Sequence, residues 1–359
     1  MSLNVFVSEY LCSGGCSLAE AEPSLLAEGL AMLEAVLSDL LKIPDIQVQT
    51  CVQEGLLTSG DFQQAEREQR LQLHRVRQPE LEIELFHQAC QRADVAWVIA
   101  PEFDDLLVSR TRLAQENGTR VVGPDLETIQ LTADKWYLYQ FLNEAGIPVI
   151  ETELLTDDFG FPKHFPCLIK QRFGAGGLGL ERFERLEDWQ KRIPELQTGL
   201  HASVWQPFVT GKALSVAVLI QEGHCELCPI GEQRIGWESG FVYQGGRIPV
   251  TLELECEQAI HKLVNRVCRR LPGLAGYVGF DILLPEQTPH SPLLVEINPR
   301  LTTSYTGYRQ LTSDNLAERV LGMKAEAPLI CWETGDAVKF QADGSFEYIL
   351  QNEKDERCM

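Results

Sequence analysis

The sequence predicts an α/β fold with a parallel sheet near the N-terminus and a mixed sheet in the C-terminal half. Over the first third of the chain, short apolar segments alternate with helix-forming segments, which is typical of a parallel sheet covered by helices. Later, two strand-like segments are separated only by a turn-rich loop, which predicts a hairpin. The 359 residues are enough for two or three domains, and 44% hydrophobic with 23% charged residues is ordinary globular composition.

The N-terminal third contains one well-patterned helix between candidate strands. Leucines recur along Pro23–Leu41 at alternating spacings of four and three, which places them on one helix face. Ligands on parallel sheets bind at the carboxyl ends of strands, so Ser8–Cys16 and Pro101–Asp105 are either ligand-binding turns or ordinary turns. A polar, helix-like stretch separates the second strand from the third. The expected strands are Asn4–Val7, Ile46–Thr50, Val95–Ala100 and Val121–Gly123.

A second helix is expected at Thr132–Gly146. Thr132 can cap its start, and Gly146 with the following Pro148 closes it. Lys135 lies in the first turn, where a cation opposes the helix dipole. Either an anion binds nearby, or Lys135 is simply exposed to solvent.

A glycine-rich segment follows the strand expected at Phe165–Gln171. Arg172–Gly179 has four glycines in six positions, and glycine lets backbone amides turn toward phosphate oxygens. The segment has neither the GxxxxGK[ST] pattern nor the dinucleotide fingerprint, so it is not one of those two phosphate-binding motifs. The pattern fits a flexible lid over phosphates, preceded by Lys170.

Three further segments have a readable pattern. Ala202–Ile220 predicts two strands broken at Thr210–Gly211, a connector that offers backbone groups to an adenine edge or is a plain hairpin between lobes. Glu255–Leu271 has an apolar face at helical spacing and is expected to pack on a sheet. Leu329–Leu350 is expected to form a small strand pair, and the charged residues 351–359 are expected to fray.

The chemistry is expected at a hairpin formed by Tyr277–Leu284 and Leu293–Asn298. The loop between these strands has three prolines, which cannot donate to a strand ladder. A symmetric register would pair Leu284 with Leu293, although a loop of eight residues need not be symmetric.

That register would place Asp281 opposite Glu296. Asn298 would share a face with Glu296, because side chains alternate along a strand. Two like charges about 5 Å apart repel by about 3 kcal/mol at an effective dielectric of about 20. A divalent cation held by these oxygens would offset the repulsion. The alternative is one acid that points to solvent at a sheet edge.

Charge and cysteine content limit the classes of partner. The net charge of −21 disfavours nucleic acid and anionic membranes, but it does not exclude a phosphorylated nucleotide in a locally basic pocket. We expect neither a signal peptide nor a membrane span, and a cytoplasmic location. The eleven cysteines are expected to be reduced thiols. Cys225 and Cys228 form a lone CxxC without a second ligand pair.

In this order the segments resemble the ATP-grasp superfamily of carboxylate–amine ligases, over roughly residues 4–322. The resemblance implies ATP and Mg2+ as cofactors, a small-molecule carboxylate and amine as substrates, and no nucleic-acid or membrane partner. A homodimer is one option for its assembly. The implied ATP-grasp fold divides into an N-terminal Rossmann-like domain at 1–124, a linker helix and small lid at 125–207, a catalytic subdomain at 208–323, and a strand pair with a tail at 324–359.

The resemblance also implies roles for individual residues. Lys135 and Lys170 would hold the ATP phosphates, and Arg300 would face the reacting carboxyl, which makes Lys170 and Arg300 the catalytic candidates. The remaining implied groups are Gly174, Ala175, Gly176 and Gly177 as the loop over the phosphates, Gln206, Pro207, Phe208 and Val209 as the adenine connector, and Asp281, Glu296 and Asn298 as the Mg2+ ligands.

Three stretches look similar to one subgroup of the superfamily, which includes the tyramine–glutamate ligases of methanofuran biosynthesis and the pyrrolysine-pathway ligase. These stretches are VSEYLCSGGC, Gly231–Pro249 and INPRLTTS. The likeness implies that glutamate is joined to an aryl amine through an acyl phosphate. The alternatives are a ligase that makes another peptide or a purine-pathway amide, a nucleotide-binding protein without catalysis, and a structural protein.

The sequence departs from the family pattern at two positions. Ala213 stands where many relatives carry a ribose-binding acid, so ribose would need another partner. Gly279 stands where some relatives carry an arginine, and Arg300 or Arg234 is the candidate to supply that charge.

Overall fold

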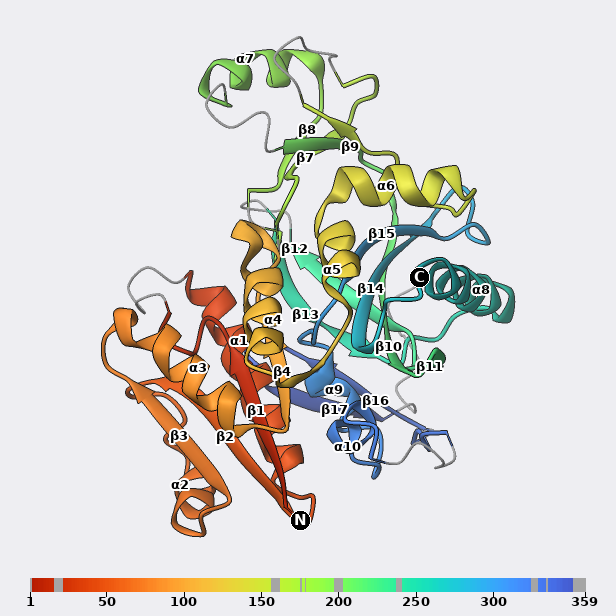
Figure 1. Cartoon of the computed structure of the whole chain (residues 1–359). Coiled ribbons are helices and arrows are strands. Elements are labelled where there is room, and N and C mark those ends of the chain that lie inside the picture. Colours follow the sequence, from red (N-terminus) through yellow and green to blue (C-terminus); the bar gives the residue numbers. More distant parts are fainter. Residues whose placement is uncertain are drawn as a thin grey trace.

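Three sheets form the framework of the described part of the chain, with five, eight and four strands, in a computed structural model (Figure 1). The expected α/β class with a parallel N-terminal sheet and a mainly antiparallel C-terminal region is confirmed. The structure describes residues 2–15, 22–155, 162–174, 176–177, 179–196, 203–236, 241–323, 329–333 and 335–350. Ala175 and the tail at 351–359, for which the sequence made predictions, lie outside these ranges.

The N-terminal sheet is parallel and has the strand order β3-β2-β1-β4-β5. The order reverses between β1 and β4, and ligands of such sheets bind beyond the carboxyl ends of the strands at this point. Its strands are β1 (Leu3–Glu9), β2 (Ile46–Gln53), β3 (Leu71–Val76), β4 (Val95–Ile99) and β5 (Arg120–Val122). Its helices are α1 (Pro23–Leu40), α2 (Gly60–Arg67), α3 (Glu82–Arg92) and α4 (Leu106–Glu116), with short 3-10 turns η1 (Pro79–Leu81) and η2 (Phe103–Asp105).

The four strands predicted here are confirmed as β1, β2, β4 and β5, but the sequence analysis missed β3. This strand lies within the stretch predicted to be polar and helical. Leu71, Leu73 and Val76 are buried, while Gln72 and Arg75 between them are exposed. The short alternation was masked by the polar helices α2 and α3 on either side.

The helix expected at Thr132–Gly146 is confirmed as α6 (Lys135–Glu144), which begins three residues later than predicted, and a separate helix, α5 (Leu126–Ala133), precedes it. Thr132 was predicted to cap the helix, which is wrong, because it lies inside α5 and donates to the backbone oxygen of Thr128 (2.7 Å). Asp134 is the N-cap of α6, accepting from the backbone amides of its first turn. Lys135 is therefore the first helical residue, and its side chain is buried.

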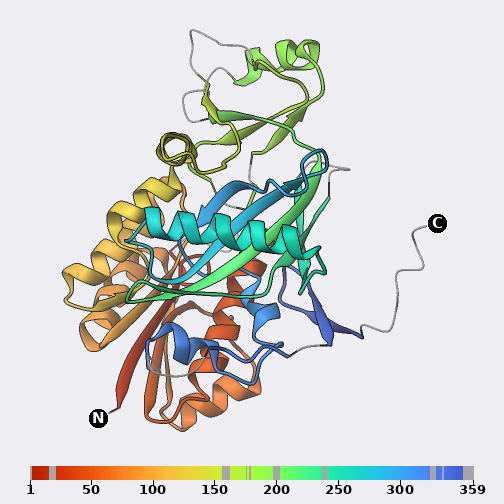
Figure 2. The same ribbon diagram turned by 90° about the vertical axis from the view of Figure 1, so that its right-hand side faces the viewer.

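The largest sheet has the path β15-β14-β10-β12-β13-β16-β17, and β11 pairs with the last residues of β10, beyond its contact with β12. Helix α8 (Leu254–Arg270), the helix expected near Glu255–Leu271, runs across one face of this sheet and buries Ile260, Leu263, Val264 and Val267 against it (Figure 2). The strands are β10 (Gly211–Gln221), β11 (His224–Leu227), β12 (Gly231–Gly236), β13 (Val242–Ile248), β14 (Gly276–Pro285), β15 (Leu293–Asn298), β16 (Asp336–Phe340) and β17 (Phe346–Leu350).

The expected C-terminal strand pair is confirmed as β16 and β17, and β16 also pairs with β13, which makes the pair part of the large sheet. The four-stranded sheet stands apart at the top of Figure 1, with its own core of Phe183, Trp189 and Trp205. Its elements are β6 (Glu153–Leu154), β7 (Cys167–Gln171), β8 (Glu181–Phe183), β9 (Ser203–Pro207) and α7 (Leu186–Leu196). The proposed boundaries after residues 124, 207 and 323 stay predictions.

One hydrophobic core joins the N-terminal sheet to the segment that follows β15. Val5 and Val7 of β1 belong to the same cluster as Tyr305 and Tyr308 of α9 (Tyr305–Tyr308), and α10 (Leu316–Val320) also contributes. The hydroxyl of Tyr305 donates to Asp39 of α1 (2.9 Å). These contacts hold α1 beside the loop after β15, where Arg300 lies. Within the described ranges, no helix is both long and apolar enough to cross a membrane.

Candidate active site

The hairpin of β14 and β15 places Asp281 directly opposite Glu296, as predicted. The register assumed for it is wrong, because Leu293 pairs with Leu283 rather than with Leu284. A β-bulge lies between the pairs Ile282–Leu294 and Asp281–Glu296, where β15 has one extra residue, Val295. The extra residue shifts the register by one, so the two acids lie opposite each other. Bulges of this kind re-aim side chains next to active sites.

Two side-chain amides donate to Asp281. Asp281 accepts from Nε2 of Gln233 on β12 (2.8 Å) and from Nδ2 of Asn298 (3.2 Å). Burial, followed by the charge of Glu296, raises the pKa of Asp281 to about 6. Gln233 was not singled out from the sequence. The donor set of two carboxylates and an amide oxygen suits a hard divalent cation.

Two lysines reach the same place from other elements. Lys135 Nζ lies 3.1 Å from Oε1 of Glu296 and donates to the backbone oxygen of Gly174 (2.9 Å). Burial lowers the pKa of Lys170 on β7, while the charge of Glu296 opposes this shift. Lys135 thus links the carboxylates to the glycine loop, and two cations balance the two acids.

The glycine loop closes against the rest of the molecule. Gly176 and Gly177 have φ of +63° and +72°, which side chains rarely adopt. A Cβ on Gly177 would lie 2.2 Å from the Phe241 ring, and one on Gly176 would lie 2.6 Å from Leu25 of α1. Glycine is therefore required here both by the backbone conformation and by the close approach of neighbours.

The connector between β9 and β10 contains part of the segment that was predicted to meet adenine, Gln206–Val209. The break predicted at Thr210–Gly211 is confirmed, because β9 ends at Pro207 and β10 begins at Gly211. The side chain of Gln206 donates to Oγ1 of Thr152 (3.0 Å), and the amide of Phe208 donates to the oxygen of Pro166 (2.9 Å). These bonds hold the connector, so a nucleotide base would use its remaining backbone groups.

Arg300 is paired across the molecule. Its Nε and Nη2 donate to the two carboxylate oxygens of Glu102, which follows β4, at 2.9 and 3.1 Å. Glu102 is 4% exposed. Glu102 lies in the turn Pro101–Asp105, which the sequence analysis noted as the carboxyl end of a parallel strand. Glu102 therefore uses the Nε and Nη2 groups of Arg300, the residue that was predicted to face the reacting carboxyl.

Two more acids surround Arg300. Glu28 of α1 accepts from Oγ1 of Thr303 (2.9 Å), and burial raises its pKa, with the charge of Arg300 opposing. Burial also raises the pKa of Glu9, at the end of β1, to about 7. A Cβ on Gly29 would lie 2.7 Å from the Glu9 carboxylate, so Glu9 lies directly behind the helix backbone next to Glu28.

The charged residues of this site, apart from Glu9 and Glu102, line one cavity of about 500 Å³. This volume lies within the usual range of ligand pockets, about 300–1,000 Å³. Of the predicted site residues in the described ranges, every one lines it: Lys135, Lys170, Gly174, Gly176, Gly177, Gln206, Pro207, Phe208, Val209, Asp281, Glu296, Asn298 and Arg300. The cavity thus has one end with the glycine loop, the two lysines and the paired carboxylates, and another end with Arg300 and Glu28.

The two departures from the family pattern also lie at this cavity. Ala213 lines it with a methyl group only. A Cβ on Gly279 would lie 2.5 Å from Cγ2 of Thr302, so the Thr302 side chain fills the space of a larger residue. Arg234 is not among the residues that line the cavity, which leaves Arg300 as the nearer arginine.

Comparison with family models identifies most of this region. Residues 132–304 match a model described as ATP-grasp domain, and residues 57–129 match one described as pre ATP-grasp 3 domain. The chain belongs to the ATP-grasp superfamily. The ATP-grasp match begins before α6 and ends after Thr303, so it includes both lysines, the glycine loop and the β14–β15 hairpin.

The relatives of this ATP-grasp chain include two tyramine–L-glutamate ligases. The one from Methanocaldococcus fervens is 26% identical over 231 residues, which is 64% of this chain and 66% of the relative. The one from Methanocaldococcus jannaschii is 25% identical over 235 residues, 64% of this chain and 63% of the relative. The chain therefore matches slightly less than two thirds of the length of these curated relatives.

Solved structures show the same fold over nearly the whole chain. An ATP-grasp superfamily protein from Archaeoglobus fulgidus superimposes with a TM-score of 0.69 and 23% identity, covering 94% of this chain and 92% of that one. The biotin carboxylase domain of Hydrogenobacter thermophilus 2-oxoglutarate carboxylase, solved with MgADP and bicarbonate, gives 0.67 and 14%, covering 94% and 74%. At these identities the likeness establishes the ATP-grasp fold alone.

Proposed function

We propose that the chain is an ATP- and Mg2+-dependent ligase that joins a carboxylate to an amine. The observation that carries the proposal is the single cavity in which the glycine loop and two lysines face the carboxylates of Asp281 and Glu296. This arrangement supports phosphoryl transfer, which needs positioning and charge neutralisation more than covalent chemistry. Neighbours of the same fold that were solved with ADP or MgADP add support.

The chain would hold the triphosphate at the end of the cavity with the glycine loop and the two lysines. Lys135 and Lys170 would neutralise phosphate charge, and the amides around Gly176 and Gly177 would close over the terminal phosphates. Asp281, Glu296 and Asn298 would hold the metal, which supplies charge neutralisation between the terminal phosphates. The raised pKa of Asp281, about 6, fits this role, since its mutual repulsion with Glu296 is relieved by a cation.

The reaction then has two steps. A carboxylate oxygen attacks the γ-phosphorus of ATP, which forms an acyl phosphate and releases ADP. The amine nitrogen attacks the acyl carbon, phosphate leaves, and the nitrogen loses a proton. Arg300, which lines the cavity, would stabilise charge on the reacting carboxyl through the guanidinium protons that Glu102 and the backbone oxygen of Leu301 do not use.

The end of the cavity with Glu28 and Arg300 fits the amine substrate. Glu28 lines the cavity beside Arg300, and Glu9 and Glu102 lie outside the lining around the same arginine, so an ammonium would be stabilised next to the carboxyl that faces Arg300. Glu28 lines the cavity and has a raised pKa, which suits a group that binds the ammonium and then accepts its proton. The sequence alone indicated no general base.

Glutamate and an aryl amine such as tyramine are the substrates that we propose first, in the synthesis of a C1-carrier cofactor like methanofuran. The support is the likeness to two tyramine–L-glutamate ligases. The nine described cysteines are free, which supports a reducing compartment such as the cytoplasm. A homodimer stays an open prediction.

The test is ADP release from ATP and L-glutamate over a panel of amines that includes tyramine. We expect amine-dependent ADP release, with the amide detected by mass spectrometry, and its loss in Glu296→Gln. Glu286→Gln, an exposed acid in the loop of the same hairpin, is the matched control and should keep the parent rate. A parent rate in Glu296→Gln would remove the basis of the proposal.

A nucleotide-binding protein without catalysis is the second candidate, and Ala213 is the feature that favours it. It predicts that ATP binds but that no amine or carboxylate stimulates ADP release. The carboxylate pair and the buried lysines favour the ligase, because binding alone does not require two opposed acids.

A further inference from the structure

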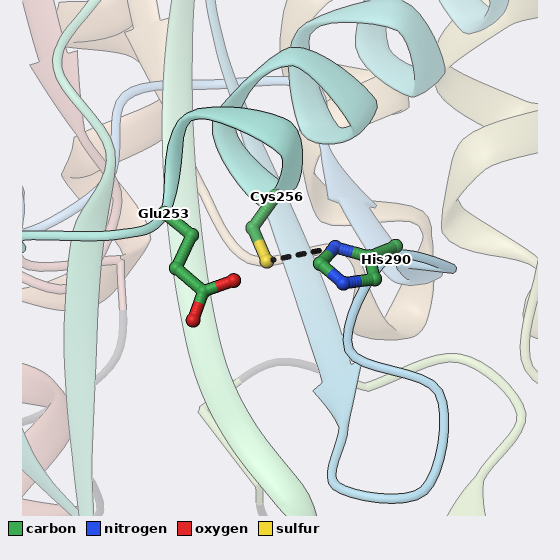
Figure 3. Close-up of side chains that lie close together, drawn as sticks. All are labelled: Glu253, Cys256 and His290. Carbon is green, nitrogen blue, oxygen red and sulfur yellow. Dashed lines mark hydrogen bonds between the residues drawn. The ribbon is translucent and has the colours of Figure 1, made fainter.

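A second group of potential ligands lies outside the cavity, where α8 begins and faces the loop between β14 and β15. Glu253 is the N-cap residue of α8, and Cys256 lies in its first turn. His290 comes from the facing loop (Figure 3). None of the three lines the ligase cavity. We propose that Glu253, Cys256 and His290 bind a zinc ion.

The geometry of the three side chains fits one small ion. The sulfur of Cys256 lies 3.5 Å from Nδ1 of His290, and one ligand atom from each residue lies within 4.8 Å of the others. Zinc bonds of about 2.3 Å to sulfur and about 2.0–2.1 Å to nitrogen, at a tetrahedral angle, separate the two ligands by about 3.5 Å. Figure 3 shows the Glu253 carboxylate turned toward the sulfur from the other side.

The donor set also fits zinc. Thiolate, imidazole and carboxylate are the three common protein ligands of this ion, whereas magnesium and calcium prefer oxygen ligands. Three protein ligands leave a fourth position for water, and the exposure of Glu253 and His290 gives solvent access to it.

A structural role for Cys256 alone explains less. Its sulfur donates to the backbone oxygen of Pro289 (3.2 Å), which accounts for a packed thiol under the loop. It does not account for Glu253, whose carboxylate makes no capping hydrogen bond at the helix start and is turned to the sulfur instead. A cysteine nucleophile is also disfavoured, since Cys256 is only 4% exposed.

The ion would tie the loop of the β14–β15 hairpin to α8. The same hairpin carries Asp281 and Glu296 farther along its strands, so zinc would stabilise the support of the ligase site without taking part in it. This inference does not depend on the proposed ligase reaction.

The test is metal binding by the full-length protein after chelator treatment and removal of the chelator. Cobalt(II) serves as the spectroscopic probe, because a bound thiolate gives a sulfur-to-cobalt charge-transfer band. We expect one equivalent to bind with this band, zinc to displace it, and zinc to raise the melting temperature. Cys256→Ser should abolish the band, and His290→Ala, in an exposed loop where folding is not at risk, should weaken zinc binding at least about 100-fold.

Two matched variants separate this site from adventitious binding. Cys331→Ser removes an exposed thiol elsewhere, and Glu257→Gln removes an exposed acid from the same helix turn, and both should leave the band unchanged. The proposal is overturned if the charge-transfer band persists in Cys256→Ser, or if His290→Ala binds zinc as tightly as the parent protein.

Discussion

Arg300 and Glu102 form a buried ion pair between segments that are 198 residues apart in the chain. Arg300 follows β15 of the large sheet, and Glu102 follows β4 of the N-terminal sheet. Their side chains are 12% and 3% exposed. The pair fixes the carboxyl edge of the parallel sheet beside the β14–β15 hairpin, and both parts of the chain contribute to one cavity.

Removing one partner of this ion pair should lower the free energy of unfolding. Glu102→Gln leaves the buried Arg300 charge without the carboxylate that is hydrogen-bonded to it, and we expect the free energy of unfolding to fall by about 3 kcal/mol. The double variant Glu102→Leu with Arg300→Met should recover part of this loss, because it removes both charges. Urea unfolding measures both effects. A loss below about 0.5 kcal/mol in Glu102→Gln would show that the pair does not hold the two parts together.

Replacing Lys170 should weaken nucleotide binding but not the fold. Lys170→Ala removes a charge that burial disfavours, so we expect an unchanged or higher melting temperature. Loss of a charged phosphate contact should raise the ATP dissociation constant about 10- to 100-fold. Calorimetric titration measures it, with Lys163→Ala, an exposed lysine near the same small sheet, as the control. Equal ATP affinity in Lys170→Ala would exclude the phosphate role.

Glu28 should govern the amine rather than the nucleotide. In Glu28→Gln we expect the KM for the amine to rise at least about tenfold, since a charge-assisted contact is lost, and the KM for ATP to stay the same. The acidic limb of the pH–rate profile should also change, because Glu28 would no longer accept a proton. Glu34→Gln, on the same helix but away from the cavity, is the control. An unchanged amine KM would contradict the proposed amine site.

Glu9 should make the folded state less stable as pH rises. Its pKa is 4.5 in the unfolded reference and about 7 when folded, where burial outweighs the amide of Cys12 and the charge of Arg300. The folded state binds the extra proton between these values, so this contribution is full below 4.5 and is lost as pH rises to about 7. The loss is about 3 kcal/mol at most. Urea unfolding of Glu9→Gln should lack this contribution, and an identical pH dependence in both proteins would refute the assignment.

The sequence located the residues that lie along one hairpin or one loop, because their relation depends on local periodicity. Asp281 was correctly placed opposite Glu296, but the assumed Leu284–Leu293 register was wrong, since a bulge leaves no mark in a pattern of alternating side chains. Asp134 was overlooked as a cap because Thr132, two residues earlier, is also a residue type that caps helices.

Contacts between residues that are far apart in the sequence could not be predicted from local sequence patterns, because the chain topology creates them. The turn after β4 was noted as a strand end, yet nothing in Pro101–Asp105 indicates that Glu102 meets Arg300. The same holds for Glu28, which is one polar residue among several on α1. Cys256 was also not predicted, because the cysteine motif visible in the sequence is the CxxC of Cys225 and Cys228, whereas His290, which lies 3.5 Å from Cys256, is 34 residues away in the chain.

The most direct test is a crystal structure of the protein grown with ADP and Mn2+, with the metal located by its anomalous scattering. The account predicts a manganese peak between Asp281 and Glu296, with carboxylate oxygens at about 2.1 Å and phosphate oxygens of the nucleotide completing its coordination. A bound nucleotide whose metal lies elsewhere, with Asp281 and Glu296 still held by Gln233 and Lys135, would contradict the account.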